Sequence, residues 1–436
     1  MTHLWKSVAE LENRDGVLYF EGCDTRDLAR QFGTPLYVYS ESRLRQNYRR
    51  LIQAYQKEYP RFKAYYAVKS NNNPAIIKVL ASEGAGADVA CVNEILMAQA
   101  AGIPSEEILY SGVYNADKDL RYAVENGVRL NLEDVSQLDR LEKIGVPKFL
   151  CFRINPGIGS SGMEGLIFAG PDAKFGIIER DIEKAYRKAK EMGVEKFGIH
   201  MMTGSNILTV DYFEEVVEKL LDIAGPMAQK LNITFDFIDI GGSLGVPYRP
   251  DEKELDIEAV AKTVVKKLRQ KLAQYNMGEP LLLHEPGRYL VCDAGILLAS
   301  VTSIKEGYKK FIGLDAGMHT LLRPALYKSY HHILCANRLN ARSDHPSNVV
   351  GQVCENTDIF AKDRPLPSDV KVGDLFAILN VGAYGFCMSS QYNSQPKAAE
   401  VLISNGKAEI IRERETYKTL IQGTHIPHHL KGAHHG

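Results

Sequence analysis

The amino-acid sequence predicts an α/β fold, in which a parallel (β/α)8 TIM-like barrel is joined to a second, mostly β (barrel- or sandwich-like) domain. First, from about residue 40 the chain alternates between amphipathic segments and short apolar runs typical of buried strands. Second, eight evenly spaced helix–strand units over about 240 residues are typical of a closed barrel. Third, long stretches of helical periodicity are absent beyond Arg288. An open, doubly wound sheet is the competing architecture, and the even spacing favours closure.

The predicted barrel helices carry their apolar residues on one face, as Phe213, Val216 and Leu220 illustrate. They cover residues 42–59, 73–83, 93–101, 116–126, 134–144, 179–192, 211–231 and 256–275. The predicted strands cover residues 63–69, 86–91, 108–112, 128–133, 148–155, 196–203, 233–241 and 279–285. Each predicted helix precedes a predicted strand, as parallel βαβ units require.

The remaining β-prone runs are separated by turn-like residues, and Ser404-Asn405-Gly406 has the pattern of a hairpin turn. These predicted strands cover residues 296–304, 309–314, 348–353, 375–379, 400–403 and 409–412, and residues 17–20 are predicted to add another. The predicted division is an N-terminal segment contributing to the β domain, the barrel, a C-terminal β domain and a His-rich tail: residues 1–40, 41–284, 285–424 and 425–436. The terminal position and Pro/Gly context of the tail favour a frayed end over a metal site.

Composition limits the possible partners and compartment. The chain has 436 residues, with 53 Lys+Arg and 54 Asp+Glu interspersed, so no basic face indicates nucleic acid or an anionic membrane. The apolar runs are strand-sized, and residues 1–7 lack the apolar core of a signal peptide. The 7 cysteines are scattered without CxxC pairs, which argues against disulfides and structural zinc. We therefore expect a cytoplasmic protein that binds neither nucleic acid nor membrane.

The ends of the predicted barrel strands carry polar and glycine residues. In order, they are Lys69, Asp88, Arg153, His200, Gly241-Gly242-Ser243-Leu244-Gly245 and Glu285-Pro286-Gly287-Arg288. Because active sites of parallel barrels lie where strands end and loops begin, these residues are expected to converge at one rim.

Lys69 directly follows the apolar run Tyr65-Tyr66-Ala67-Val68. Partial desolvation there would disfavour the ammonium form and leave a nucleophilic amine, as a covalent imine with an aldehyde cofactor requires. The alternative is that Lys69 simply extends its charged end into water, as most strand-terminal lysines do.

Three other rim features each allow two interpretations. The loop with Gly242 and Ser243 could cradle a phosphate, or could be a tight turn that needs positive φ. Glu285 could hold a pyridine nitrogen protonated, or could pair with Arg288 across a turn. His200 could present its flat ring at the rim, or could be a structural histidine.

One further motif, Gly157-Ile158-Gly159-Ser160-Ser161-Gly162, matches the dinucleotide-binding pattern GxGxxG. Pro156 opens it, however, and no convincing helix follows to bind a pyrophosphate at its N-terminus. We therefore reject a dinucleotide site.

The second domain contains further polar motifs: Asp315-Ala316-Gly317-Met318-His319, Leu322-Arg323-Pro324-Ala325-Leu326-Tyr327, Val353-Cys354-Glu355 and Gly382-Ala383-Tyr384-Gly385. Cys354 beside Glu355 could act in acid–base chemistry. It could equally be a small buried hydrophobic residue beside a surface glutamate, and composition alone favours that interpretation.

Together these motifs resemble those of the fold-type III, pyridoxal-phosphate-dependent decarboxylases, and most closely the diaminopimelate decarboxylases. The resemblance covers nearly the whole chain, with the motifs in family order. They are Tyr66-Ala67-Val68-Lys69-Ser70-Asn71, Gly198-Ile199-His200, Glu285-Pro286-Gly287-Arg288, Leu322-Arg323-Pro324-Ala325-Leu326-Tyr327, Cys354-Glu355 and Gly382-Ala383-Tyr384-Gly385.

The resemblance implies that Lys69 bonds covalently to pyridoxal 5′-phosphate and that Glu285 pairs with the pyridine nitrogen. The expected cofactor-binding set is Lys69, Asp88, Arg153, His200, Ser205, Gly242, Ser243, Glu285, Pro286, Gly287, Arg288 and Tyr384. Catalysis is assigned to Lys69 and to Cys354, which would protonate the carbanion left when carbon dioxide departs. In this family the Cys354 segment comes from the other subunit, which implies a homodimer with shared active sites.

The expected substrate-binding residues are Arg288, Arg323, Tyr327, Glu355 and Tyr384. meso-Diaminopimelate carries a second carboxylate, which Arg323 can bind as a fork, and a second ammonium, which Glu355 can accept. Lysine or ornithine would leave Arg323 without a partner. The expected reaction is therefore decarboxylation of meso-diaminopimelate to L-lysine.

Alternatives are decarboxylation of ornithine, arginine, lysine or a carboxylated polyamine, an amino-acid racemase, and a non-catalytic homologue. The sequence also departs from the family pattern at three places, two in the cofactor site and one near the substrate arginine. Met202 replaces the second of two histidines, Ser243 replaces a third glycine, and His319-Thr320 replaces an Asn-Asp pair near the substrate arginine.

Overall fold

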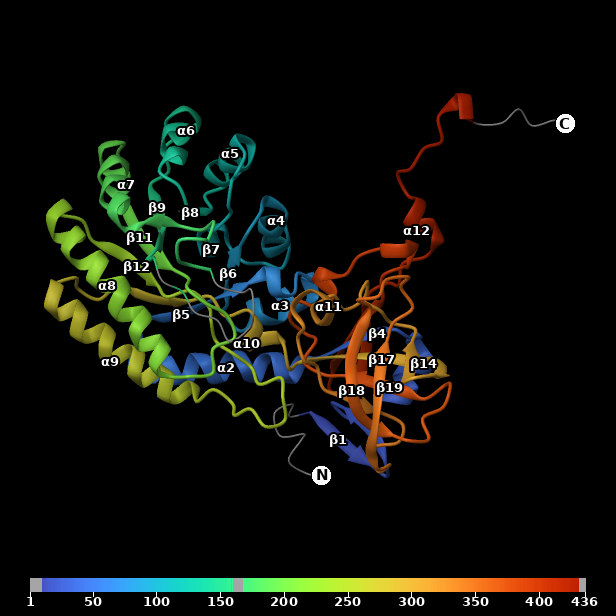
Figure 1. The fold of residues 1–436 in the computed structure, drawn as a ribbon. Coiled ribbons are helices and arrows are strands. Elements are labelled where there is room, and N and C mark those ends of the chain that lie inside the picture. Colours follow the sequence, from blue (N-terminus) through green and yellow to red (C-terminus); the bar gives the residue numbers. More distant parts are fainter. Residues whose placement is uncertain (1–9, 158, 160–167, 431–436) are drawn as a thin grey trace.

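The structure, a computed structural model, describes residues 10–157, 159 and 168–430. Eight parallel strands follow one another in the order β5-β6-β7-β8-β9-β11-β12-β13, and β13 pairs with β5 to close the ring (Figure 1). They are β5 Phe62–Ala67, β6 Gly86–Val89, β7 Ile108–Tyr110, β8 Arg129–Leu132, β9 Phe149–Asn155, β11 Lys196–Met201, β12 Phe235–Asp239 and β13 Leu281–His284. The short β10 (Ile177–Ile178) pairs with β9. The predicted closed barrel is confirmed.

Eight helices cover the outside of the barrel, each near a predicted range (Figure 1). They are α2 Glu41–Glu58, α3 Pro74–Ser82, α4 Val92–Ala100, α5 Asp117–Glu125, α6 Ser136–Ile144, α7 Glu179–Glu191, α8 Asp211–Leu231 and α9 Ile257–Tyr275. Side-chain caps help fix where they begin, since Ser40, Asn73 and Asp256 accept backbone N–H groups at the starts of α2, α3 and α9. Among the described residues, no helix is both long and apolar enough to cross a membrane.

The second domain is mostly β, as predicted. Its large sheet has the order β18-β17-β15-β14-β4-β20-β21, and β19 pairs with both β14 and β16. These strands are β4 Leu36–Ser40, β14 Gly295–Glu306, β15 Lys310–Leu314, β16 Ile333–Cys335, β17 Ser343–Val350, β18 Ile359–Pro367, β19 Leu375–Ile378, β20 Ala399–Ser404 and β21 Lys407–Arg412. Short helices occur at α10 Arg288–Val291, α11 Arg323–Tyr327 and α12 Tyr417–Ile421.

In the N-terminal segment, residues 17–20 form the predicted strand, but this strand lies outside the large sheet. Residues 17–20 form β2 in a separate small sheet with β1 (Leu11–Arg14) and β3 (Cys23–Asp24), followed by α1 (Thr25–Phe32). This small sheet packs on the β domain, because Leu18 and Phe20 are fully buried and the Leu18 N–H bonds the Ala336 carbonyl at 2.7 Å. The strand that enters the large sheet is instead β4, which the sequence analysis did not identify.

Several sequence predictions fall wholly or partly on residues that the structure does not describe. These are the expectation about residues 1–7, most of the rejected GxGxxG motif (158 and 160–162), and the last part of the His-rich tail (431–436). Residues 425–430 of the tail are exposed.

A short turn places Lys69 at the barrel rim. β5 ends at Ala67, and residues 68–70 form a single 3-10 turn. The Ser70 hydroxyl donates to the Ala67 carbonyl at 2.8 Å, and the Tyr66 hydroxyl donates to the Asn71 carbonyl at 2.8 Å. The Tyr384 N–H donates to the Ser70 carbonyl at 2.7 Å, so a residue of the second domain also holds this turn in place.

Candidate active site

A cavity of about 290 Å³ lies where the barrel strands end and is bounded on one side by the second domain. The barrel part contributes Lys69, Asp88, Ala90, Ser111, Val113, Arg153, Phe168, Phe175, His200, Met202, Ser205, Glu285 and Arg288. The second domain contributes Arg323, Tyr327, Tyr384 and Met388. The cavity thus gathers side chains that are more than 300 residues apart in sequence.

Lys69 faces this cavity, with 48% of its side chain exposed, and its Nζ donates to Asp88 Oδ2 at 3.0 Å. Desolvation lowers the pKa of Lys69, but the charges of Asp88 and Glu285 outweigh it, so the pKa is raised above its ordinary value. The prediction that desolvation would free the amine is therefore wrong, because a carboxylate partner keeps it protonated. The alternative of a lysine pointing into bulk solvent also fails, since Asp88 itself is buried.

Glu285 lies opposite Lys69 in the cavity and pairs with His200, whose Nε2 is 3.1 Å from Glu285 Oε2. The other ring nitrogen of His200, Nδ1, accepts from the Asn131 amide at 3.0 Å, which leaves the proton on Nε2. Burial raises the pKa of Glu285, but His200, Lys69 and Arg153 outweigh burial and lower it to about 2. Glu285 is therefore a carboxylate at neutral pH, and its partner is His200 rather than Arg288.

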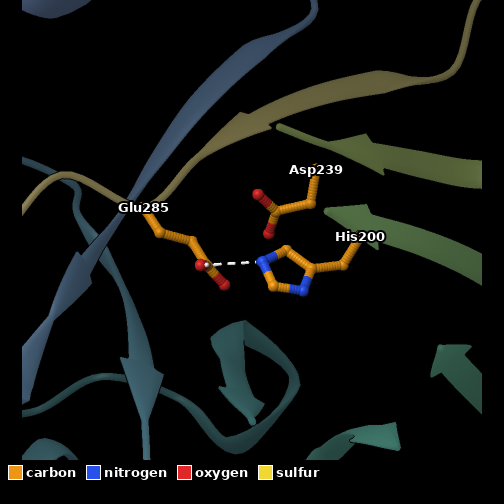
Figure 2. A group of neighbouring side chains, drawn as sticks. All are labelled: His200, Asp239 and Glu285. Atoms are coloured by element: carbon orange, nitrogen blue, oxygen red, sulfur yellow. Dashed lines mark hydrogen bonds and ion pairs between the residues drawn. The ribbon is translucent and has the colours of Figure 1, made fainter. Parts of the chain in front are cut away.

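A second carboxyl group, Asp239 at the end of β12, points toward the same place (Figure 2). It is fully buried, its Oδ1 accepts the Gly241 N–H at 2.8 Å, and its Oδ2 has no hydrogen-bond partner among the described residues. Desolvation and the charge of Glu285 raise the pKa of Asp239 well above its ordinary value. The pKa values of the two neighbouring carboxyl groups are therefore shifted in opposite directions, down for Glu285 and up for Asp239.

His200, Asp239 and Glu285 place one potential metal-ligand atom each within 4.8 Å of one another. Their existing hydrogen bonds argue against a metal centre. His200 Nε2 already donates a proton to Glu285, and Asp239 Oδ1 already accepts the Gly241 N–H. The cluster is therefore better suited to holding protons than a metal ion.

We expect the variant Asp239→Asn to gain stability relative to the wild type as pH rises. Because the folded pKa of Asp239 is raised, its stabilising contribution is complete below the unfolded pKa of about 3.9 and is lost as pH rises through the folded value. Asparagine does not titrate. Thermal unfolding of the cofactor-free protein between about pH 4 and 8 should show an advantage that grows by about 1–3 °C.

Asp236→Asn on the same strand is the matched control, since Asp236 is exposed. Asp236→Asn should not show the growing advantage expected of Asp239→Asn. An advantage of Asp239→Asn that stays flat or shrinks with pH would show that Asp239 is ionised.

Two buried arginines form the far wall of the cavity. Arg288 begins α10 and donates to the hydroxyls of Tyr248 and Ser205, the latter at 3.4 Å. Arg323 begins α11, and its guanidinium carbon lies 5.9 Å from the Tyr384 ring centre, while that of Arg288 lies 5.0 Å from the same ring. This wall therefore offers two cations to anionic groups of a ligand.

The glycine loop after β12 is held by close backbone contacts. A Cβ on Gly242 would lie 2.5 Å from the Glu285 carbonyl oxygen, so this position requires glycine. Ser243 has φ of 66°, and its hydroxyl donates to the Gly204 carbonyl at 2.9 Å. The Gly242 N–H points at Met202 Sδ at 3.2 Å, and Met202 lines the cavity. The tight-turn interpretation thus applies to this loop, with its serine hydroxyl used inside the protein.

Other predicted site residues lie off this cavity. Cys354 is exposed and its N–H donates to Asn393 Oδ1 at 2.6 Å, so its interpretation as a buried hydrophobic residue is wrong. Neither Cys354 nor the exposed Glu355 is among the described residues that line the cavity of their own chain. Gly242, Ser243, Pro286 and Gly287 are likewise not among the described residues that line the cavity. His319 is buried and bonds the Thr320 hydroxyl at 3.0 Å.

Comparisons with known proteins agree with this geometry. Residues 45–292 match the family described as pyridoxal-dependent decarboxylase, pyridoxal binding domain. The chain belongs to the pyridoxal-dependent decarboxylase family. A diaminopimelate decarboxylase of Methanothermobacter thermautotrophicus is 46% identical over 96% of this chain and 98% of that protein. One from Archaeoglobus fulgidus is 37% identical over 95% of this chain and 99% of that protein.

Solved structures give the same result for the fold. A crystal structure of diaminopimelate decarboxylase from M. jannaschii in complex with L-lysine has a TM-score of 0.90 and 33% identity. The similarity covers 97% of this chain and 99% of that one. This chain is therefore an amino-acid decarboxylase that uses pyridoxal phosphate.

The cavity fits the family cofactor on its own geometry. Glu285 Oε1 and Asp88 Oδ1 are buried without hydrogen-bond partners among the described residues, although both side chains line the cavity. A ring nitrogen and a protonated amine are groups that such oxygens bind. The Arg288 guanidinium at the same cavity suits a phosphate. Lys69 lines the same cavity and would supply the amine that bonds to an aldehyde.

Proposed function

We propose that the chain converts meso-2,6-diaminopimelate to L-lysine and carbon dioxide. The observation that carries this proposal is the convergence, in one cavity, of the Lys69 amine, the Glu285 carboxylate and a wall of two buried arginines. Relatives named for this reaction align over nearly the whole chain. The reaction belongs to lysine biosynthesis.

When bound, pyridoxal phosphate supplies an electron sink for the breaking bond between the α-carbon and its carboxylate. Lys69 would hold the cofactor through its amine, and Asp88 is placed to accept a proton from that amine. Glu285, with its lowered pKa, would favour a protonated ring nitrogen. His200, fixed by Asn131, in turn holds Glu285 in place.

The remaining residues bind and orient the phosphate end of the cofactor and the distal end of the substrate. Ser205, Arg288 and Tyr384 line the side suited to the phosphate. Gly242, Pro286 and Gly287, which do not line the cavity, would support the residues that do. Arg153 also lines the cavity, held by an ion pair to Glu133 at 2.9 Å, and would help to hold the cofactor. Arg323 and Tyr327 face the position of the substrate's distal end, where a carboxylate would pair with the guanidinium.

A homodimer completes the site in this proposal. Cys354 and Glu355 are exposed and off their own cavity, as residues that serve a second subunit would be. Cys354 then donates the proton to the α-carbon, and Glu355 accepts the distal ammonium. Ser243 would support the glycine loop after β12, where its carbonyl accepts the Ile207 N–H at 2.9 Å. We further propose a cytoplasmic location, in keeping with reduced cysteines.

Measuring carbon dioxide release from meso-diaminopimelate, lysine, ornithine and arginine tests the proposed function. We expect turnover of diaminopimelate to exceed that of each other amino acid by about 10⁴-fold in kcat/KM, because the others lack the distal carboxylate. Turnover of lysine or ornithine that equals or exceeds that of diaminopimelate would rule out the assignment.

The variant Arg323→Ala should raise the KM for diaminopimelate by about 10- to 100-fold, the usual cost of losing a hydrogen bond to a charged group. Arg249→Ala is the matched control, because Arg249 stacks on Tyr330 at the surface, 4.6 Å from its ring centre. An unchanged KM in Arg323→Ala would place the distal carboxylate elsewhere.

A further inference from the structure

Tyr248 lies in the loop between β12 and α9, behind the arginine wall of the active site. Only 6% of it is exposed, and it is not among the described residues that line the cavity. Its hydroxyl accepts a hydrogen bond from Arg288 Nη1. Its ring lies beside both guanidinium groups, with the ring centre 5.6 Å from the Cζ of Arg288 and 5.5 Å from that of Arg323.

We propose that Tyr248 is a positioning residue that sets the cofactor-side arginine through its hydroxyl and the substrate-side arginine through its ring. This inference rests on the proposed function, which assigns Arg288 to the phosphate and Arg323 to the distal carboxylate. The hydroxyl of this side chain would then control the affinity for the cofactor, and its ring would control the affinity for the substrate.

The chemistry of a phenol suits this position. A carboxylate here would orient the arginines by neutralising them, and would compete with the anionic ligands. A neutral hydroxyl accepts one guanidinium N–H and leaves the positive charge available. Burial raises the pKa of Tyr248 to about 12, although Arg288 and Arg323 oppose the rise, so the phenol stays neutral at physiological pH.

Tyr248 is itself held in place. Cys292 Sγ donates to its hydroxyl at 3.1 Å, and the His331 ring meets its ring edge-on, with the centroids 5.3 Å apart at 87°. Across the two guanidinium groups lies Tyr384, whose ring is 5.0 Å from the Cζ of Arg288. Arg288 thus lies beside two aromatic rings and Arg323 beside three, including Tyr327, and these rings restrict both side chains.

The test uses two variants of the full-length holoenzyme. Tyr248→Phe removes the hydroxyl and keeps the ring, so we expect the Kd of pyridoxal phosphate to rise about tenfold, with the KM for diaminopimelate within about twofold of wild type. Tyr248→Leu removes both, so we expect both quantities to rise about tenfold or more. Equilibrium dialysis of reconstituted protein gives the Kd, and initial rates at saturating cofactor give the KM.

Tyr186→Phe is the matched control, because the buried Tyr186 hydroxyl bonds the Gly198 carbonyl at 2.6 Å outside the cavity. It should lower thermal stability to a similar extent while changing neither the Kd nor the KM. A folded Tyr248→Phe with wild-type cofactor affinity would overturn the role of the hydroxyl, and an unchanged KM in folded Tyr248→Leu would overturn that of the ring. Wild-type protein that neither binds pyridoxal phosphate nor releases carbon dioxide would instead refute the proposed function.

Discussion

The variant Lys69→Ala is expected to lose the visible absorbance that wild-type protein acquires on binding pyridoxal phosphate, and to lose turnover by roughly 10⁴-fold or more. The reason is geometric, because Lys69 is the amine that faces the cavity between Asp88 and Glu285. Spectra before and after addition of the cofactor, and carbon dioxide release, measure the two effects.

Lys63→Ala provides a matched control on the same strand, since Lys63 pairs with Glu107 at the opposite end of β5. It should keep both the spectrum and the turnover. If Lys69→Ala retained the wild-type absorbance, another amine would have to bond to the cofactor, and the assignment of the whole cavity would fall.

The variant Cys354→Ala is expected to bind pyridoxal phosphate normally but to lose turnover by about 10²- to 10⁴-fold, the usual contribution of a positioned proton donor. The proposed shared site makes a stronger prediction. Mixing Lys69→Ala and Cys354→Ala chains should restore about one quarter of wild-type activity. At random pairing about half of the dimers are mixed, and one of the two sites in each regains both residues.

Cys23→Ala is the control for this experiment, because Cys23 lies on β3 of the small N-terminal sheet. It should retain full activity alone and should not complement Lys69→Ala any better than wild-type chains do. Absence of recovery in mixed chains whose exchange is shown by mass spectrometry would place each site within a single chain.

The sequence predicted those features that repeat locally. The barrel helices have clear apolar faces, and their order alone identified the closed barrel and the rim where Lys69, His200 and Glu285 meet. β4 was missed because its five residues lie directly before α2, and their two partner strands begin more than 250 residues later. Pairing at that range leaves no local pattern.

The parts of the site that escaped prediction depend on contacts between distant residues. Asn131 and Asp239 lie inside strand patterns, and nothing local shows that they point into the barrel toward His200 and Glu285. Asp239 could have been noticed as an acidic residue at the end of a strand, directly before the glycine loop. The expected direction of the Lys69 pKa shift is wrong, because that direction depends on Asp88, which lies on the neighbouring strand β6.

The position of β4 also bears on how the molecule can move and fold. The chain leaves the large sheet at the end of β4 to build the barrel, and returns to it in β14, which pairs directly with β4 from Leu36 to Tyr39. The barrel is therefore an insertion into the β domain, and the two chain connections between the domains lie side by side. Two adjacent connections restrict rotation of one domain against the other. They therefore help to keep Tyr384 of the second domain close to Lys69 of the barrel. During synthesis, β4 must also wait for β14 and β20, which are made much later, before the large sheet can form.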